Sequence, residues 1–232
     1  MMQKWIKPFL HLFFPRYCVV CGRRLREEEQ ILCMECDLHL PRTNLHRQKD
    51  NMVEQLFWGK IPIERGTAFY YYHRGGVYTE LVHQLKYQGR QDIGTVMGRL
   101  MAYELAPTSF FDNIHSILPV PLHKKRFRER GYNQSECLAR GVSEVTGIPI
   151  DTTSIARIRY TATQTHKSAH ERYENMQEVF RLQVPAASLA GRHILLMDDV
   201  LTTSATLTAC ADALKEVPDL RISILALALS AE

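Results

Sequence analysis

Two neighbouring acids stand where an apolar segment gives way to small hydroxyl residues. Residues 194–197 are apolar, and the stretch 198–206 contains Asp198, Asp199, Thr202, Thr203, Ser204, Ala205 and Thr206. This order predicts a buried strand, a short loop and the start of a helix. Backbone N–H groups at a helix start bind phosphate well, because they are unpaired donors at the positive end of the helix dipole. Open α/β sheets bind ligands at the carboxyl ends of their strands, so the two carboxylates are placed to hold ribose hydroxyls.

The segment 194–207 is neither of two common nucleotide motifs. It lacks the Gly-Lys-Thr/Ser of a P-loop and the Gly-x-Gly-x-x-Gly of a dinucleotide fingerprint. It resembles the phosphoribosyl pyrophosphate (PRPP) motif of type I phosphoribosyltransferases: four apolar residues, two acids, two apolar residues and a Thr-rich phosphate loop. Ser204 departs from that motif, which usually has Gly here, and we expect it to tighten the loop. An N-capped helix after a strand would explain the threonines but not the pair of acids.

Four of the six cysteines form two Cys-x-x-Cys pairs, made by Cys18, Cys21, Cys33 and Cys36. Zn²⁺ prefers four soft ligands in a tetrahedron, and two such pairs supply them from one short hairpin. We therefore predict a structural zinc site with no open position for chemistry. A thioredoxin-like redox site needs one pair that opens a helix, and disulfides are disfavoured where no secretory signal is found. Cys137 and Cys210 stand alone and are predicted to be small core residues.

A basic loop is predicted after the apolar segment 114–120. Residues 123–130 contain one acid, Glu129, and five cations: Lys124, Lys125, Arg126, Arg128 and Arg130. The excess equals the formal net charge of the whole chain, which is +4. We expect Arg126 and Arg130 to face a pyrophosphate group, which needs cations beyond a strand end. Phe127 and Tyr132 leave nucleic-acid binding open, through base stacking and phosphate contacts, and a solvated surface is the third interpretation.

A second polar loop is predicted over residues 157–175. It contains Arg157, Arg159 and Lys167 among threonines and ends in Glu171-Arg172. Such a loop is able to close over a bound anion as a lid. His166 and His170 have i, i+4 spacing but no third metal ligand, so we interpret them as surface histidines.

The elements that must position these residues alternate between strand and helix. Candidate strands lie at 66–72, 114–120, 194–197 and 222–229. The helical spacing of apolar residues predicts one helix that ends at 86–87 and others at 93–105, 136–145 and 207–214. This alternation predicts an α/β fold with a mostly parallel sheet.

Length and composition suit one α/β domain with a small appendage. The 232 residues are 45% hydrophobic and 23% charged, which excludes collagen-like, coiled-coil and wholly disordered chains. We divide the chain into a cysteine module at 1–45, a connector at 46–65 and a phosphoribosyltransferase-like domain at 66–232. The apolar stretch 5–14 is short and interrupted, and no other segment approaches the roughly 20 apolar residues that span a bilayer. We expect a cytoplasmic protein with reduced thiols and no membrane insertion.

The ordered set of motifs resembles the ComF family (competence protein F) over nearly the whole chain. The set comprises the two Cys-x-x-Cys pairs, Leu85-Lys86-Tyr87, the Pro-Val-Pro strand with its basic loop to Gln134, the loop from Arg157 to Asn175, and the Asp-Asp-x-x-Thr-Thr loop. The resemblance implies a zinc ribbon joined to a type I phosphoribosyltransferase fold. It also implies a role in natural transformation, handling incoming single-stranded DNA at the cytoplasmic side beside a helicase-like partner, ComFA.

As an enzyme, such a protein would bind PRPP with Mg²⁺. Residues 202–206 would hold the 5′-phosphate, Asp198 and Asp199 the ribose hydroxyls, and Arg126 and Arg130 the pyrophosphate. Positioning and charge stabilisation then suffice, without a covalent nucleophile. Two functions stay open: a competence protein that uses the fold to handle DNA, and an active phosphoribosyltransferase of nucleoside or nucleobase metabolism. The sequence does not identify the acceptor substrate, because the segments that select it share no motif between such enzymes.

Overall fold

A four-stranded parallel sheet with the strand order β1-β6-β5-β2 forms the centre of the protein. The computed structural model describes residues 15–159 and 179–230. The four strands are β1 (Arg65–Tyr72), β2 (Ser116–Pro119), β5 (His193–Leu201) and β6 (Arg221–Ser230). β6 pairs with β1 on one edge and β5 on the other, and its apolar run is buried because a core lies on each face of the sheet. The predicted α/β fold with a parallel sheet is confirmed.

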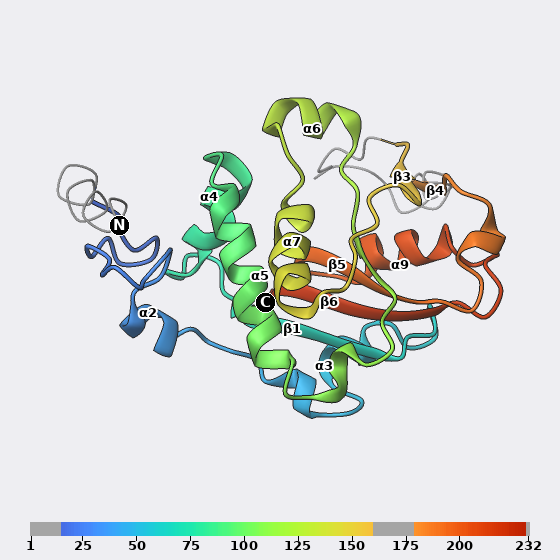
Figure 1. The fold of residues 1–232 in the computed structure, drawn as a ribbon, viewed down its shortest axis with the longest axis horizontal. Coiled ribbons are helices and arrows are strands. Elements are labelled where there is room, and N and C mark those ends of the chain that lie inside the picture. The colour runs from blue at the N-terminus through green and yellow to red at the C-terminus, as the bar shows by residue number, and fades with distance from the viewer. Residues whose placement is uncertain (1–14, 160–178, 231–232) are drawn as a thin grey trace, which may run out of the picture.

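Helices cover both faces of this sheet (Figure 1). One face packs against α4 (Thr79–Tyr87), α5 (Gln91–Leu105) and α7 (Gln134–Thr146). The other packs against α3 (Met52–Gln55), α9 (Ala205–Asp212) and an antiparallel pair, β3 (Ile155–Arg157) with β4 (Phe180–Leu182). Shorter helices are α2 (Met34–Leu38), α6 (Lys124–Arg130) and the 3-10 turns Leu45–Arg47, Ser109–Phe111 and Ala186–Ser188.

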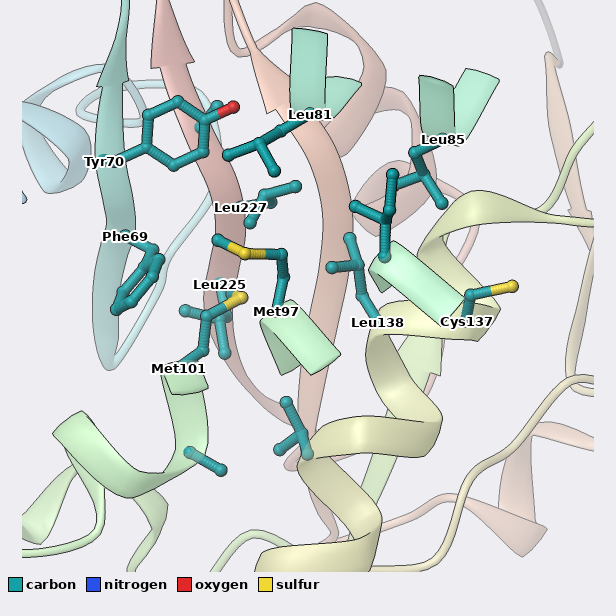
Figure 2. Packing of buried hydrophobic residues seen from close by; sticks show 14 of the residues in the cluster. Phe69, Tyr70, Leu81, Leu85, Met97, Met101, Cys137, Leu138, Leu225 and Leu227 are labelled. Atoms are coloured by element: carbon teal, nitrogen blue, oxygen red, sulfur yellow. The ribbon is translucent and has the colours of Figure 1, made fainter. Parts of the chain in front are cut away.

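The first face of the sheet is held by a continuous apolar core (Figure 2). Met97 and Met101 of α5 lie beside Phe69 of β1 and Leu225 and Leu227 of β6. Eight buried side chains of the cysteine module belong to the same core: Cys18, Val19, Leu25, Ile31, Leu32, Cys33, Cys36 and Leu40. Because this core is shared, the module and the sheet bury apolar surface against one another.

Glycines allow α5 and α7 to pack at very close range. A Cβ atom on Gly98 would stand 2.1 Å from the carbonyl oxygen of Leu138, and one on Gly141 would stand 2.1 Å from that of Thr95. Only glycine avoids both clashes. This crossing fixes α7 so that its first turn, at Gln134, lies beside the carboxyl ends of β2 and β5.

Two elements differ from the sequence prediction. The strand at 194–197 does not end before the acids but continues to Leu201, with Asp198 opposite Ala226 of β6. The prediction of a basic loop over 123–130 is wrong, because Lys124–Arg130 forms helix α6. Lys, Arg and Glu favour helix, and Gly131, with φ at 82°, ends it in the left-handed conformation that glycine adopts readily.

The other candidate strands and helices are confirmed, with ends shifted by a few residues. The second polar loop is described only as far as Arg159. The remaining residues that we named there lie outside the described residues: His166, Lys167, His170, Glu171, Arg172 and Asn175. None of the helices in the described ranges is long and apolar enough to cross a membrane.

The stretch 46–65, predicted as a connector, packs on the first strand. Asn51 caps α3 by accepting hydrogen bonds from the backbone N–H groups of Val53 and Glu54, and it donates to the carbonyl oxygen of Gly66 at 2.9 Å. Val53 and Phe57 are fully buried in the apolar core on the second face of the sheet. The stretch is therefore part of the layer that covers the second face of the sheet.

Polar contacts fix the cysteine module to the helical layer. Arg42 forms ion pairs with Asp37 and with Glu104 of α5, each at 2.8 Å. The Tyr78 hydroxyl, at the start of α4, donates to the carbonyl oxygen of Cys36 at 2.9 Å. The module is thereby attached to both α4 and α5.

Candidate functional site

A cavity of about 830 Å³ opens at the carboxyl ends of the strands. Its lining includes Tyr72 at the end of β1, Ser230 at the end of β6, Val120 after β2, and both acids of β5. Because all four strands are parallel, their carboxyl ends meet at this one edge, where open α/β sheets bind ligands.

The two acids have different surroundings within the cavity. Asp199 is buried and forms an ion pair with Nζ of Lys86, from the last turn of α4, at 2.9 Å. Oδ1 of Asp198 accepts hydrogen bonds from the Ser135 hydroxyl at 3.1 Å and from the Asp199 backbone N–H at 2.9 Å. Burial and the neighbouring charge of Asp199 raise the pKa of Asp198 to about 7.

This raised pKa gives a pH dependence that is testable on the ligand-free protein. In the unfolded chain the Asp198 carboxyl ionises near its ordinary pKa of 3.8, whereas in the folded protein it stays protonated to about pH 7. Between pH 4 and pH 7 only the unfolded chain releases the Asp198 proton. The free energy of unfolding is therefore highest, as far as this group is concerned, below pH 4 and decreases as the pH rises to 7. We expect Asp198→Asn, a neutral mimic, to be more stable than wild type at pH 8 and equal to it near pH 4. Urea unfolding in magnesium-free buffer measures the difference; a difference that does not change with pH would contradict the assignment.

Part of the predicted phosphate loop faces the cavity. Thr202 and Thr206 line it beside the acids, whereas Thr203, Ser204 and Ala205 do not. Helix α9 begins at Ala205, with Ser204 as its N-cap residue. Three residues therefore join β5 to α9, and the first turn of α9 lies at the same end of the sheet as the acids.

Cations from three elements line the cavity. They include Arg126 and Arg130 of α6, Lys86 of α4 and Arg157 of β3. The Arg130 guanidinium lies over the ring of Tyr87, 5.5 Å from its centroid, and Arg157 lies over Phe180 at 5.4 Å. With Arg74, five Lys and Arg residues line the cavity against three acids (Glu80, Asp198 and Asp199), which suits a ligand with several negative charges.

The structure adds residues whose place in the site the sequence did not predict. The sequence placed Lys86 only at a predicted helix end, yet its ammonium forms an ion pair with the Asp199 carboxylate. Ser135 and Gln134 open α7, and the Gln134 side chain, 1% exposed, lines the cavity with no hydrogen-bond partner for Nε2 among the described residues. The start of a helix directly after the basic segment, capped by Asn133, is the signal that could have indicated Gln134 and Ser135.

The four cysteines of the two Cys-x-x-Cys pairs form a second candidate site. Their Sγ atoms all lie within 4.8 Å of one another, so the cluster could hold a metal ion such as zinc. The backbone N–H of Cys33 donates to Sγ of Cys18, and that of Cys36 donates to Sγ of Cys33, each at 3.4 Å. Burial is outweighed by backbone N–H hydrogen bonds, which lower the pKa of Cys18 to about 7, whereas burial and the neighbouring thiols raise the pKa of Cys36.

Comparison with curated proteins finds relatives over most of the chain. It is 32% identical over 200 residues to the DNA utilization protein YhgH of Escherichia coli (strain K12), covering 85% of this chain and 83% of that protein. The Salmonella typhimurium protein of the same name is 36% identical over the same shares. Competence protein F of Haemophilus influenzae is 30% identical over 140 residues, which is 59% of this chain and 61% of that one.

Family models and solved structures were compared as well. No family model matches the chain. Among solved structures, a glutamine PRPP amidotransferase from B. subtilis is similar with a TM-score of 0.39 and 19% identity, covering 61% of this chain and 30% of that one. A hypoxanthine-guanine phosphoribosyl transferase from L. donovani has a TM-score of 0.35 and 20% identity, covering 58% of this chain and 71% of that one.

Proposed function

This chain belongs to the ComF family of competence and DNA-utilization proteins, and we propose that it binds PRPP with Mg²⁺ and handles incoming single-stranded DNA in the cytoplasm during natural competence. The cavity is the observation that supports the first part. It combines two acids, two threonines from the turn and helix start after β5, and a cationic wall, which are the groups that ribose hydroxyls, a phosphate and a diphosphate require.

In this proposal each wall of the cavity holds one part of the ligand. Asp198 and Asp199 accept hydrogen bonds from the ribose hydroxyls, and Thr202 and Thr206 donate to the 5′-phosphate. Arg126 and Arg130 of α6 face the diphosphate. Mg²⁺, when bound, neutralises part of the diphosphate charge, and the carboxylates beside it are the oxygen ligands that Mg²⁺ prefers.

Lys86 has two roles in this proposal, one without ligand and one with ligand bound. Without ligand its ammonium neutralises Asp199 at 2.9 Å, so the site does not contain an isolated buried carboxylate. When Asp199 accepts hydrogen bonds from the ribose hydroxyls, the flexible side chain of Lys86 lets its ammonium move to the diphosphate. If a phosphoribosyl group is transferred, these cations stabilise the leaving diphosphate, and no covalent nucleophile is needed.

Isothermal calorimetry tests this ligand directly. We expect the protein to bind PRPP in the presence of Mg²⁺ and to lose most of that affinity when Mg²⁺ is withheld. No heat of binding at millimolar PRPP would overturn the proposal. Consumption of PRPP with a nucleobase or nucleoside acceptor would favour the second candidate function, an active phosphoribosyltransferase, for which the size of the cavity leaves room.

The DNA-handling part of the proposal is based on family membership and on helix α6. No residue of α6 is buried, and Phe127 is 46% exposed beside the helix's five cations. An exposed aromatic ring among cations is the combination that binds single strands, by base stacking and phosphate contact. The family also leads us to propose a helicase-like partner, ComFA, and a zinc ion in the cysteine cluster.

Neutralising three arginines of α6 is expected to weaken binding of a single-stranded oligonucleotide. With Arg126, Arg128 and Arg130 changed to Gln, affinity should fall about tenfold or more at low salt. The slope of log affinity against log salt should also decrease by about 2, since each lost phosphate contact removes about 0.7. Fluorescence anisotropy across a salt series measures both.

A charge-matched control uses three exposed cations away from the cavity: Arg192, Lys215 and Arg221. Changing these to Gln removes the same charge, so it separates a contact from a general electrostatic effect. If the α6 variant and wild type bind the oligonucleotide with equal affinity, α6 does not contact DNA. An equal loss in the control variant would show that only net charge matters.

A further inference from the structure

One buried amide in the wall of the large cavity is not explained by the fold. Gln134, the first residue of α7, is 1% exposed and lines the cavity. Its Nε2 finds no hydrogen-bond acceptor within residues 15–159 and 179–230. Buried side-chain amides are nearly always hydrogen-bonded, because an unpaired donor has lost its bonds to water and gained nothing in return. Packing alone would therefore favour an apolar side chain at this position.

The two residues before Gln134 are fixed to neighbouring elements by their own side chains. The Tyr132 hydroxyl donates to the carbonyl oxygen of Leu85 in α4. Nδ2 of Asn133 donates to the carbonyl oxygen of Val120, which follows β2, at 3.0 Å. Oδ1 of the same asparagine caps α7. These bonds hold the start of α7 in place, so the position of Gln134 does not depend on a bond of its own.

The residue after Gln134 is fixed to the proposed ribose site. The Ser135 hydroxyl donates to Oδ1 of Asp198 at 3.1 Å. On the other side along the chain, α6 contributes Arg126 and Arg130 to the same cavity. Gln134 thus comes between the acid that we assign to the ribose and the arginines that we assign to the diphosphate. In PRPP the diphosphate is attached directly to the ribose, so a donor between these groups suits a diphosphate oxygen.

We propose that Gln134 is a ligand-contacting residue, whose Nε2 donates a hydrogen bond to a diphosphate oxygen of PRPP. The inference rests on the proposed function, which assigns the cavity to PRPP. Binding would give a buried donor its acceptor without adding a further charge to the cationic wall. Because the side chain is already buried and its backbone is held by neighbouring bonds, little conformational entropy is lost when the contact forms.

Gln134→Met separates binding from folding, because methionine is similar in length and cannot donate a hydrogen bond. We expect this variant to bind PRPP with Mg²⁺ about tenfold more weakly, since a hydrogen bond to a charged group is lost. The Tm without ligand should equal or exceed that of wild type, because a buried unpaired amide is removed. Gln91→Met, at the exposed first residue of α5 and outside the cavity, is the matched control and should bind as wild type. Calorimetry and thermal melting measure the two effects.

Two further measurements identify the donor and its acceptor. Gln134→Glu keeps the shape of the side chain, but at pH 8 its carboxylate repels the diphosphate, so binding should be weaker still than in Gln134→Met. Inorganic diphosphate and ribose 5-phosphate, each with Mg²⁺, represent the two parts of PRPP. Gln134→Met should weaken binding of inorganic diphosphate by about the same factor as PRPP and leave binding of ribose 5-phosphate unchanged.

The proposal is overturned if Gln134→Met binds PRPP within twofold of wild type, or if Gln134→Glu binds it as well as wild type. It is also overturned if Gln134→Met weakens ribose 5-phosphate as much as diphosphate, or lowers the Tm, which would indicate a structural role for the amide. If wild type binds no PRPP, the proposed function fails, and inorganic diphosphate alone decides the role of Gln134. Wild type that binds neither ligand would overturn both.

Discussion

Asp199→Asn is expected to weaken the binding of PRPP with Mg²⁺ by about 100-fold or more. The substitution keeps the shape of the side chain but removes its charge, so the ribose hydroxyls lose charge-assisted hydrogen bonds worth about 1.5–3 kcal/mol each. Two such losses amount to about 3 kcal/mol or more, which is about two orders of magnitude in affinity.

Calorimetry with Asp199→Asn and a matched control isolates the role of this carboxylate. Asp212→Asn removes an exposed carboxylate from the last residue of α9, outside the cavity, and should bind as wild type. Circular dichroism should show the same fold in both variants. If Asp199→Asn binds PRPP within twofold of wild type, the carboxylate does not contact the ligand and the assignment of the ribose site is wrong.

The main elements of the fold were predictable because they depend on local pattern. The apolar run at 222–229 predicted a buried strand, and β6 is a central strand of the sheet. The order of strand, acids and small hydroxyl residues predicted the turn from β5 into α9. In each case burial of consecutive residues determines the structure, and burial leaves a clear pattern in the sequence.

Local apolar pattern failed where helix propensity, and not burial, determines the structure. The five cations of 124–130 suggested a loop because they have no apolar period, but α6 buries none of its residues and needs no apolar face. Its formation depends on intrinsic propensity and on the helix end at Gly131. Short helices of this kind are weakly marked in a sequence.

The contacts that complete the site were also beyond sequence reasoning. Lys86 and Asp199 are far apart in the chain, and Ser135 is 63 residues from Asp198. Such pairs meet only because the fold brings α4 and the start of α7 to the carboxyl end of β5. Their residue types give no signal, since a lysine at a helix end is ordinarily a solvated charge.

Removing the zinc ion that we propose for the cysteine cluster is expected to destabilise the whole protein and not the module alone. Cys33 is fully buried, its Sγ lies 3.7 Å from that of Cys21, and it caps α2. Cys33→Ser should therefore lose the zinc. Structural zinc sites contribute about 10–16 kcal/mol of apparent binding energy. At about 2–4 °C per kcal/mol for a chain of this length, even a third of that energy lowers Tm by roughly 10 °C.

The loss should spread because the module and the helical layer share one core. At the start of α4, the Tyr78 hydroxyl donates to the Cys36 carbonyl oxygen, and the last turn of the same helix contains Lys86 at the proposed ligand site. We therefore expect Cys33→Ser, or wild type treated with a strong chelator, to bind PRPP more weakly as well as to melt earlier. Metal analysis and calorimetry measure the two effects, and Cys137→Ala, at a buried cysteine outside the cluster, should keep its zinc. Purified wild type without metal, or a Tm that does not respond to chelator, would show that the four cysteines are not a zinc site.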